Sequence, residues 1–296
     1  MAKIVCFGEI LWDVFPTHEK IGGAPLNVAY RLRSFGHQVS MISAVGNDNY
    51  GSKLIAYLKE TKINTDCIQV LDNYETGKVQ VTLDEEGSAA YNIKHPSAWD
   101  NITILSATKT LVEQADAFIF GSLATRDETS RKTLFELIET STYKIFDLNL
   151  RPPHYTIDIL KHLMLKADFI KFNDEELLEV SDFMNSKYSS LEDNLRFIAK
   201  ETNTRHLCVT KGKDGAVVLY EGEFYYNSGY SVNVVDTVGA GDSFLGTLIS
   251  ELLTHKSPQK AIDIACAVAA IVAQSEGANP KILKADIDDF VQSYLS

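Results

Sequence analysis

The sequence predicts an α/β fold in which a mostly parallel central sheet is covered by helices on both faces. Short apolar runs alternate with longer stretches of helical periodicity along nearly the whole chain, which is the pattern of strands joined by crossover helices. Most of these runs are continuously apolar, as strands buried on both faces are. Two further runs alternate apolar and polar residues, and they predict a small second sheet that is exposed on one face.

The elements are expected in the following order. The first strand is expected at residues 4–8, and a helix at 24–35 ends at Gly36. A strand at 39–45 and a helix at 50–61 follow. Apolar runs then predict strands at 117–120, 144–148, 169–172, 206–210 and 216–220. Periodic stretches predict helices at 128–140, 157–166, 175–180, 191–202, 242–253, 258–274 and 285–293.

The two alternating runs lie at residues 76–83 and 89–94, joined across a polar, glycine-bearing turn at 84–88. With residues 10–15 they predict a small sheet that stands off the main domain. A small sheet beside a ligand crevice suggests a lid, and an exposed apolar face on it suggests a homodimer joined through that lid. We therefore expect one domain over residues 1–296, with lid strands inserted at about 10–16 and 76–95.

The composition excludes several function classes. The 296 residues carry a formal net charge of -12, so a nucleic acid or an anionic membrane is not an expected partner. The four cysteines are scattered, without the spacing of a zinc site, and read as reduced core residues. The first apolar run is too short for a signal peptide, and residues 265–273 are too few to span a membrane. The sequence therefore predicts a cytoplasmic protein.

The most informative segment is residues 236–242, a glycine-rich turn that leads into an apolar helix. Small residues at a helix N-terminus present free backbone N–H groups, which form a ready anion site. The carboxylate of Asp242 would repel a phosphate, but it can accept a proton from a hydroxyl that attacks one. The segment predicts phosphoryl transfer to an alcohol. The alternative is that Asp242 is only the N-cap of the helix.

Two N-terminal segments suggest a binding site for hydroxyl groups. Asp13 closely follows the first strand, at the sheet edge where α/β folds bind ligands, and a carboxylate can accept hydrogen bonds from two neighbouring sugar hydroxyls. Gly22 and Gly23 allow a close approach of the backbone, and Asn27 lies one helical turn beyond them. The alternatives are an exposed Asp13 in a lid strand and an ordinary glycine turn. No dinucleotide-binding fingerprint follows the first strand.

Two later strands also end in polar groups. Asn173 and Glu176 follow the strand at 169–172, where Asn173 could bind a phosphate oxygen and Glu176 could hold Mg²⁺ through water. The alternative is a helix N-terminus in which acidic residues favour the helix dipole. Thr210, Gly212 and Gly215 would suit a nucleotide loop, and the alternative for them is a simple hairpin turn.

Together these segments occur in the order found in one known family. The chain resembles the ribokinase-like (PfkB) family of carbohydrate kinases over almost its full length, and most closely the bacterial fructokinases. The matching motifs are Gly22-Gly23-x-x-x-Asn27, Asp147-x-Asn149-x-Arg151, Asn173-x-x-Glu176, Thr210-x-Gly212-x-x-Gly215, Asp236-Thr237-x-Gly239-Ala240-Gly241-Asp242 and Gly277-Ala278-x-Pro280. The resemblance implies a ribokinase-like three-layer fold with a β-sheet lid, and ATP-dependent phosphorylation of the 6-hydroxyl of D-fructose to fructose 6-phosphate.

The resemblance also implies a role for each matching residue. Asp242 would be the general base, and the amides of Gly239, Ala240 and Gly241 would be the anion hole for the transferring phosphoryl group. Asn173 and Glu176 resemble the phosphate and Mg²⁺ pair. The residues that resemble the ATP loop are Thr210, Gly212 and Gly215. Those that resemble sugar contacts are Asp13, Gly22, Gly23, Asn27 and Asn149.

Family members are often activated by a monovalent cation near the anion hole. Here its implied ligands are the Asp236 carboxylate and the backbone carbonyls of Val238, Val272 and Gly277. Lys281 departs from the family pattern, in which a small hydroxyl residue is common at this position. Its ammonium could replace or repel K⁺, so the resemblance leaves K⁺ dependence open.

Alternative functions remain open at this stage. The 2-keto-3-deoxygluconate kinases share the 147–151 motif, and Lys94 with Arg151 could bind the carboxylate of such a sugar acid. A ribokinase is a further alternative within the family. A non-catalytic sugar-binding regulatory protein would be favoured by a substitution at Asp242, Gly239 or Gly241, and the sequence retains all three. A nicotinamide-dependent dehydrogenase is disfavoured because the fingerprint for that cofactor is missing.

Overall fold

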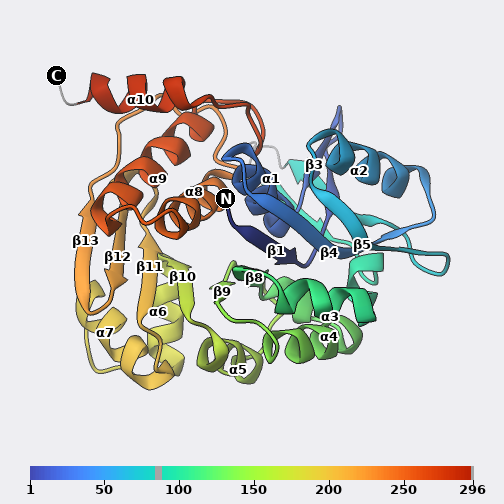
Figure 1. Cartoon of the computed structure of the whole chain (residues 1–296), viewed down its shortest axis with the longest axis horizontal. Coiled ribbons are helices and arrows are strands. Elements are labelled where there is room, and N and C mark those ends of the chain that lie inside the picture. The colour runs from blue at the N-terminus through green and yellow to red at the C-terminus, as the bar shows by residue number, and fades with distance from the viewer. Residues whose placement is uncertain (84–88, 295–296) are drawn as a thin grey trace.

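The computed structural model describes residues 1–83 and 89–294, and the expected turn at 84–88 lies outside the described residues (Figure 1). A nine-stranded sheet forms the centre of the molecule in the order β13-β12-β11-β10-β9-β8-β1-β4-β5. The strands in that order are β13 (Glu223–Asn227), β12 (Ala216–Tyr220), β11 (His206–Thr210), β10 (Phe169–Asn173), β9 (Lys144–Asp147), β8 (Ala117–Gly121), β1 (Lys3–Phe7), β4 (Gln38–Gly46) and β5 (Asn64–Leu71). Neighbours pair in parallel except for the antiparallel pairs β11–β12 and β12–β13, which confirms the mostly parallel sheet.

Helices cover both faces of this sheet. They are α1 (Ala24–Ser34), α2 (Asn49–Glu60), α3 (Ser106–Glu113), α4 (Glu128–Ile138), α5 (Ile157–Lys166), α6 (Asp174–Phe183), α7 (Leu191–Thr202), α8 (Ala240–Leu253), α9 (Pro258–Ala273) and α10 (Lys284–Ser293). One core contains buried residues of α3 to α7, and a second core contains buried residues of α1, α2, α8 and α9. Alternate residues of β1 enter the two cores, since Val5 faces the first and Ile4 the second. The three-layer fold is therefore confirmed (Figure 1).

The lid is a separate four-stranded sheet in the order β3-β2-β6-β7. Its strands are β2 (Leu11–Val14), β3 (Glu19–Gly22), β6 (Gly77–Leu83) and β7 (Ala89–Ile93). The β2–β6 pair is parallel, and the other two pairs are antiparallel. Leu11, Val79 and Val81 form its small apolar core, with Phe15 and Ile93 packed against it. The expected lid strands are thus confirmed, and β3 is an additional strand.

Among the described strands and α-helices, β3, β5, β13 and α3 were not expected. The strands β5 and β13 are the two edges of the central sheet, and most of their residues are partly exposed, so they lack a continuous apolar run. β3 has four residues, of which two are charged, and α3 spans only eight residues. Short or half-exposed elements carry too weak a periodic signal to be found from the pattern.

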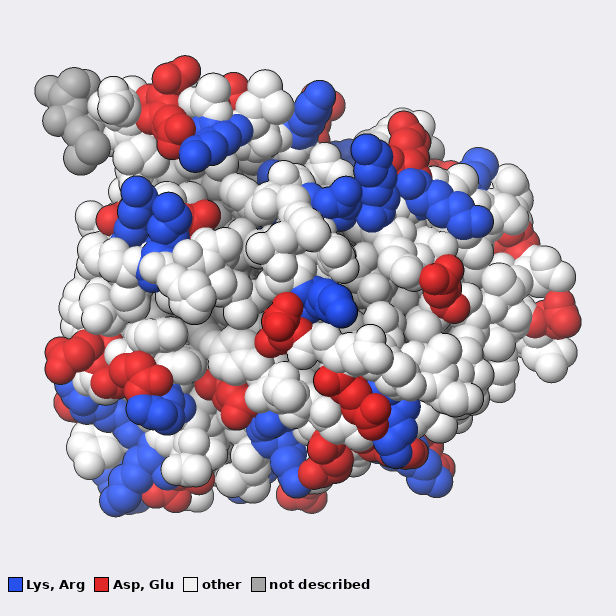
Figure 2. All heavy atoms as spheres, in the orientation of Figure 1, with Lys and Arg blue, Asp and Glu red and all other residues white. Residues whose placement is uncertain are grey.

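The surface and the core agree with the composition. All four cysteines are buried and free. In the part of the chain that the structure describes, none of the helices has the length and apolar character needed to cross a membrane. On the face shown in Figure 2, acidic and basic side chains are interspersed, and they do not gather into a basic surface.

Candidate active site

A cavity of about 740 Å³ lies where the carboxyl ends of the central strands meet the lid and the start of α8. Most of the candidate residues line it: Asp13, Gly23, Asn27, Asn149, Arg151, Asn173, Thr210, Asp236, Val238, Gly239, Gly241 and Asp242. Asn173 and Thr210 end the parallel strands β10 and β11, whose carboxyl ends lie at one edge of the sheet. The lid, the loop after β9 and the N-terminal ends of α1 and α8 supply the others. Several residues that sequence reasoning did not assign to the site also line the cavity, notably Lys20 and Lys171.

The N-terminus of α8 presents backbone amides to this cavity. The N-cap is Gly239 in a left-handed conformation (φ 78°), and a Cβ there would lie 2.4 Å from the Cβ of Ala278. The Ala240 N–H donates to the Thr237 carbonyl at 3.2 Å. Among the described residues, Gly239 and Gly241 have no such acceptor and line the cavity. An anion would therefore meet two free amides, because Ala240, expected as the third, is already engaged.

Asp242 is the third residue of α8, so the alternative that it is only the N-cap is wrong. Its Oδ2 accepts a hydrogen bond of 2.8 Å from Asn27 Nδ2, and Asn27 Oδ1 accepts one of 2.8 Å from Asn279 Nδ2. Burial, with repulsion from Asp147 as a second cause, raises the pKa of Asp242 to about 6. The group is mostly ionised at neutral pH, and its raised pKa suits a proton acceptor.

Asp13 and Gly23 line the lid side of the cavity, and Gly22 lies beside Asp13. A Cβ on Gly22 would lie 2.3 Å from Asp13 Oδ2, and a Cβ on Gly23 (φ 112°) would lie 2.5 Å from the Glu9 carbonyl oxygen. Gly23 must therefore be glycine, because its backbone conformation and the Glu9 backbone both oppose a side chain. A side chain at Gly22 would instead displace the Asp13 carboxylate. Burial raises the pKa of Asp13 to about 6, although Lys20 lowers it. Burial also raises the pKa of Glu9, which lines the cavity, to about 7.

Asn173 and Glu176 form the N-terminus of α6. Glu176 Oε2 accepts a 2.8 Å hydrogen bond from Asn173 N, and Asn173 Oδ1 accepts one of 2.7 Å from Glu176 N. Glu176 Oε1 accepts a third, of 2.8 Å, from the backbone of Leu150. Burial raises the pKa of Glu176. Both of its carboxylate oxygens thus bind backbone amides, and it joins two loops in the manner of a capping box. Direct binding of Mg²⁺ by Glu176 does not fit this arrangement.

The expected nucleotide loop lies between β11 and β12. Thr210 lines the cavity at the end of β11, and its Oγ1 donates to the Phe172 carbonyl at 3.3 Å. Gly212 and Gly215 form a short turn, in which both glycines have positive φ. A Cβ on Gly215 would lie 2.0 Å from the Asn227 carbonyl oxygen, whereas one on Gly212 would meet no atom within 4 Å. Gly215 is thus required by the hairpin, and Gly212 lies in open space.

The Asp236 carboxylate, expected as a cation ligand, is already hydrogen-bonded on both oxygens. Oδ1 accepts from Val238 N at 3.0 Å, and Oδ2 accepts from Gly277 N at 3.1 Å and from Lys20 Nζ at 3.2 Å. Burial raises the pKa of Asp236, but these hydrogen bonds outweigh it and lower the pKa overall. The Lys20 ammonium therefore supplies a positive charge at this carboxylate, and a monovalent cation would have to compete with it.

Of the three carbonyls expected as further cation ligands, that of Val272 accepts a backbone hydrogen bond of 2.9 Å from Ser275 near the C-terminus of α9. Of the two basic residues expected to bind a sugar acid, Arg151 lines the cavity and donates to the Leu150 carbonyl at 2.8 Å. Lys94 does not line the cavity, and its ammonium pairs with the carboxylate of Glu75. The structure therefore does not bring Lys94 and Arg151 together as a clamp.

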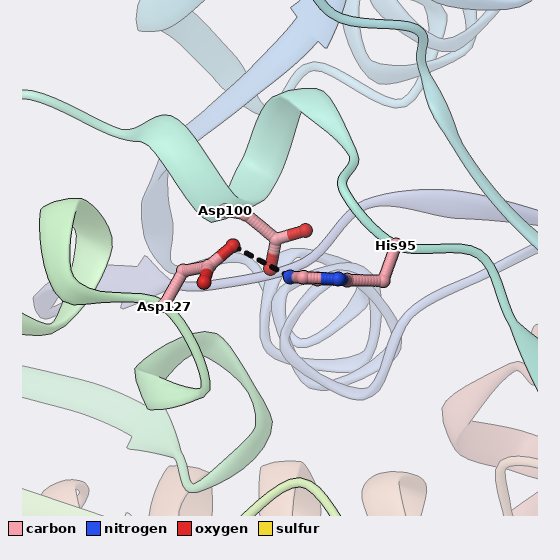
Figure 3. Close-up of side chains that lie close together, drawn as sticks. All are labelled: His95, Asp100 and Asp127. Carbon is pink, nitrogen blue, oxygen red and sulfur yellow. Dashed lines mark hydrogen bonds and ion pairs between the residues drawn. The ribbon is translucent and has the colours of Figure 1, made fainter.

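A second cluster lies outside the cavity, where the chain leaves the lid. The ligand atoms of His95, Asp100 and Asp127 lie within 4.8 Å of one another, and His95 Nε2 is 2.8 Å from Asp127 Oδ2 (Figure 3). Both oxygens of the buried Asp100 also bind the Arg126 guanidinium, at 2.7 Å each. The guanidinium already supplies the positive charge that a metal would bring, so this cluster joins the lid to the main domain as an ion pair.

Comparisons with known proteins agree with this geometry. Residues 1–285 match the model of the pfkB family carbohydrate kinases. Fructokinase-2 of Solanum habrochaites is 28% identical over 94% of this chain and 92% of its own length, and the fructokinase of Escherichia coli is 26% identical over 94% and 95%. A fructokinase structure from Xylella fastidiosa with bound ATP has a TM-score of 0.88 at 21% identity over 100% of both chains. A fructokinase structure from Vibrio cholerae in fructose-, ADP- and calcium-bound form has a TM-score of 0.84 at 25% identity over 98% of this chain and 99% of its own.

Proposed function

From the premise that this chain belongs to the pfkB family of carbohydrate kinases, we propose that it phosphorylates the 6-hydroxyl of D-fructose with ATP to give fructose 6-phosphate. The observation that carries the proposal is the position of Asp242. Its partly buried carboxylate lines the cavity in the first turn of α8, beside the free amides of Gly239 and Gly241. A proton acceptor and an anion site at one place are what phosphoryl transfer to an alcohol requires.

In the proposed reaction, Asp242 accepts the proton of the sugar hydroxyl as the oxygen of that hydroxyl bonds to the γ-phosphorus. The bond from this phosphorus to the bridging oxygen of ADP breaks, and ADP leaves. The amides of Gly239 and Gly241 stabilise the charge on the transferring group. Asn27 keeps the Asp242 carboxylate pointed at the hydroxyl through the 2.8 Å hydrogen bond.

The remaining cavity residues divide between the two substrates. Asp13 would accept hydrogen bonds from sugar hydroxyls, and Gly23 lets the backbone approach the sugar. Asn173 and Thr210 would face the nucleotide, which carries Mg²⁺ on its phosphates when it binds. Glu176 would support Asn173, because its carboxylate accepts a hydrogen bond from the Asn173 backbone N–H. Any contact of Glu176 with Mg²⁺ would be through water.

We favour fructose as the substrate because the relatives are named fructokinases and because the Asp13 carboxylate can accept hydrogen bonds from sugar hydroxyls. A 2-keto-3-deoxygluconate kinase is the second candidate, favoured by Arg151 in the cavity wall. The pairing of Lys94 with Glu75 weakens this second candidate, since it removes one of the two cations expected to bind the acid.

The test is an ADP-release assay with MgATP and fructose, 2-keto-3-deoxygluconate, ribose, glucose or mannose, each with and without K⁺. Turnover on fructose and not on the sugar acid supports the proposal, and the reverse preference overturns the substrate. Asp242→Asn should lower kcat by orders of magnitude while fructose binding, measured by calorimetry, persists. If the wild type releases no ADP with any of these sugars, a non-catalytic sugar-binding protein is favoured.

We further propose that this single domain works in the cytoplasm as a homodimer joined through the lid. The lid is a four-stranded sheet outside the central sheet, and Phe15 and Ile93, which pack against its small apolar core, are only partly buried. A second copy of the chain could cover such partly exposed apolar residues. Light scattering at micromolar concentration should give twice the mass of the chain. A monomer under those conditions would contradict the dimer and leave the catalytic proposal intact.

A further inference from the structure

Lys171 is a buried lysine at the cavity end of β10. It is 6% exposed, and its neighbours in the strand, Phe169, Ile170 and Phe172, are buried apolar residues of the two cores. A lysine among such residues is costly to bury, since its charged form loses most of its hydration. Lys171 nevertheless lines the cavity. A role in the chemistry of the cavity would explain why a charge is placed there.

The ammonium is held by one carboxylate. Lys171 pairs directly with Asp147 of the neighbouring strand β9, and its Nζ lies 2.9 Å from Asp147 Oδ1. Burial lowers the pKa of Lys171, but the charges of Asp147, Glu176 and Asp242 outweigh it and raise the pKa overall. Lys171 is therefore protonated at neutral pH.

In the described part of the chain, two N–H groups of the Lys171 ammonium are free to donate hydrogen bonds near α8. An ammonium has three N–H groups, and among the described residues the one to Asp147 is the only hydrogen bond that Lys171 Nζ makes. A Cβ built on Gly241 would lie 3.6 Å from this Nζ. The positive charge thus lies against the first turn of α8, beside the two free amides and within reach of the charge on Asp242.

On the basis of the proposed phosphoryl transfer, we propose that Lys171 is a catalytic residue whose ammonium contacts the oxygens of the transferring phosphoryl group. It donates hydrogen bonds to the charge that develops there, together with the amides of Gly239 and Gly241, and it gives up no proton. Asp147 is a positioning residue, because it fixes the ammonium and keeps it protonated. Asp242 alone accepts the proton of the hydroxyl, so the two charged groups have separate roles.

The first test replaces the ammonium with an apolar chain of similar length. Lys171→Met should lower kcat by about 10²–10³-fold, which is typical for loss of one donor at a developing charge. Fructose binding by calorimetry should change little, and Lys171→Arg should restore part of kcat. The matched control is Lys132→Met in α4, since the Lys132 side chain is 74% exposed and pairs with Glu128 on the surface. A kcat of Lys171→Met within threefold of the control overturns the proposal.

The second test is a pH profile, in which the alkaline limb reports whether the reaction needs the charge of the Lys171 ammonium. Removing Lys171 removes a charge that lowers the pKa of Asp242, so the acid limb of kcat should move to higher pH in Lys171→Met and Lys171→Gln. Asp147→Asn keeps Lys171 but weakens its protonation, so kcat should fall at alkaline pH where the wild type stays active. If the acid and alkaline limbs of the kcat profile stay at the wild-type pH in folded variants, the catalytic role of Lys171 is rejected. Failure of the wild type on all sugars would instead reject the underlying function.

Discussion

Asn27 Nδ2 donates a 2.8 Å hydrogen bond to Asp242 Oδ2, which joins two residues 215 positions apart at the wall of the cavity. The Asn27 amide is itself oriented, because its Oδ1 accepts a hydrogen bond from Asn279 Nδ2. The nitrogen of Asn27 must therefore face the carboxylate. This chain of hydrogen bonds sets the direction of the Asp242 carboxylate before any substrate binds, and it lowers the pKa that burial has raised.

Removing this hydrogen bond should therefore change the pH dependence of the reaction. We expect kcat of the wild type to fall as the pH drops through about 6, where Asp242 becomes protonated. In Asn27→Ala the ionised carboxylate loses a donor, so its pKa rises and the acid limb moves to higher pH. Asn279→Ala is the control for orientation alone and should shift the limb less. An acid limb at the wild-type pH in both variants would contradict the role of Asn27.

The same carboxylates should make the unliganded protein less stable at neutral pH than at acid pH. Burial raises the pKa of Asp13 and Asp242 from 3.8 to about 6, and that of Glu9 from 4.5 to about 7. A group whose pKa is higher in the folded than in the unfolded state stabilises the fold fully below its unfolded pKa, and this contribution is lost as the pH rises through its folded pKa. The free energy of unfolding should therefore decline between about pH 4 and pH 7 from these groups.

Asp242→Asn should accordingly stabilise the unliganded protein at pH 8. The amide has no charge to desolvate, and the expected gain is about 1–2 kcal/mol, less than the full pKa shift implies because the cavity admits water to the carboxylate. Urea unfolding at pH 5 and pH 8 measures this, and the gain should be small at pH 5. Equal free energies of unfolding for the variant and the wild type at pH 8 would show that desolvation of the Asp242 charge does not destabilise the fold.

Gly239 should tolerate no side chain. Gly239→Ala would add a Cβ 2.4 Å from Ala278 at a residue with φ 78°, so both the clash and the left-handed backbone oppose it. The first turn of α8 would have to move, and we expect kcat to fall at least tenfold, since small displacements of catalytic groups cost much of the rate. The matched control is Gly36→Ala, at φ 88° with no atom within 4 Å of the added Cβ. It should destabilise the protein by about 1 kcal/mol and leave kcat unchanged. Similar kcat values for the two variants would contradict the prediction.

Much of the fold follows from the sequence, because the buried strands and their covering helices have strong periodic signals. The edge strands β5 and β13 do not, because their half-exposed residues lack a continuous apolar run. In the site, residues in glycine-rich or strand-end motifs could be predicted, and most of them line the cavity.

Lys171 and Lys20 could not be predicted in the same way. Lys171 is one polar residue in an apolar strand, and only the pairing of β9 with β10 places it beside Asp147. Lys20 belongs to the short strand β3, which itself had no sequence signal. Their partners Asp147 and Asp236 are 24 and 216 positions away. Contacts at such separations follow from the folded sheet and not from local pattern.

The Lys20–Asp236 contact gives a last prediction, on K⁺. The ammonium lies 3.2 Å from Asp236 Oδ2, at the carboxylate that the family resemblance assigns to a monovalent cation. Because both are single positive charges, Lys20→Met should make the carboxylate available, and K⁺ should then stabilise the variant by mass action. We expect the unfolding temperature of Lys20→Met to rise with KCl relative to tetramethylammonium chloride at equal ionic strength, and that of the wild type to rise less. Lys132→Met, which changes a surface lysine of α4, should respond as the wild type does. An equal response to K⁺ in all three proteins would show that Lys20 and K⁺ do not compete for Asp236.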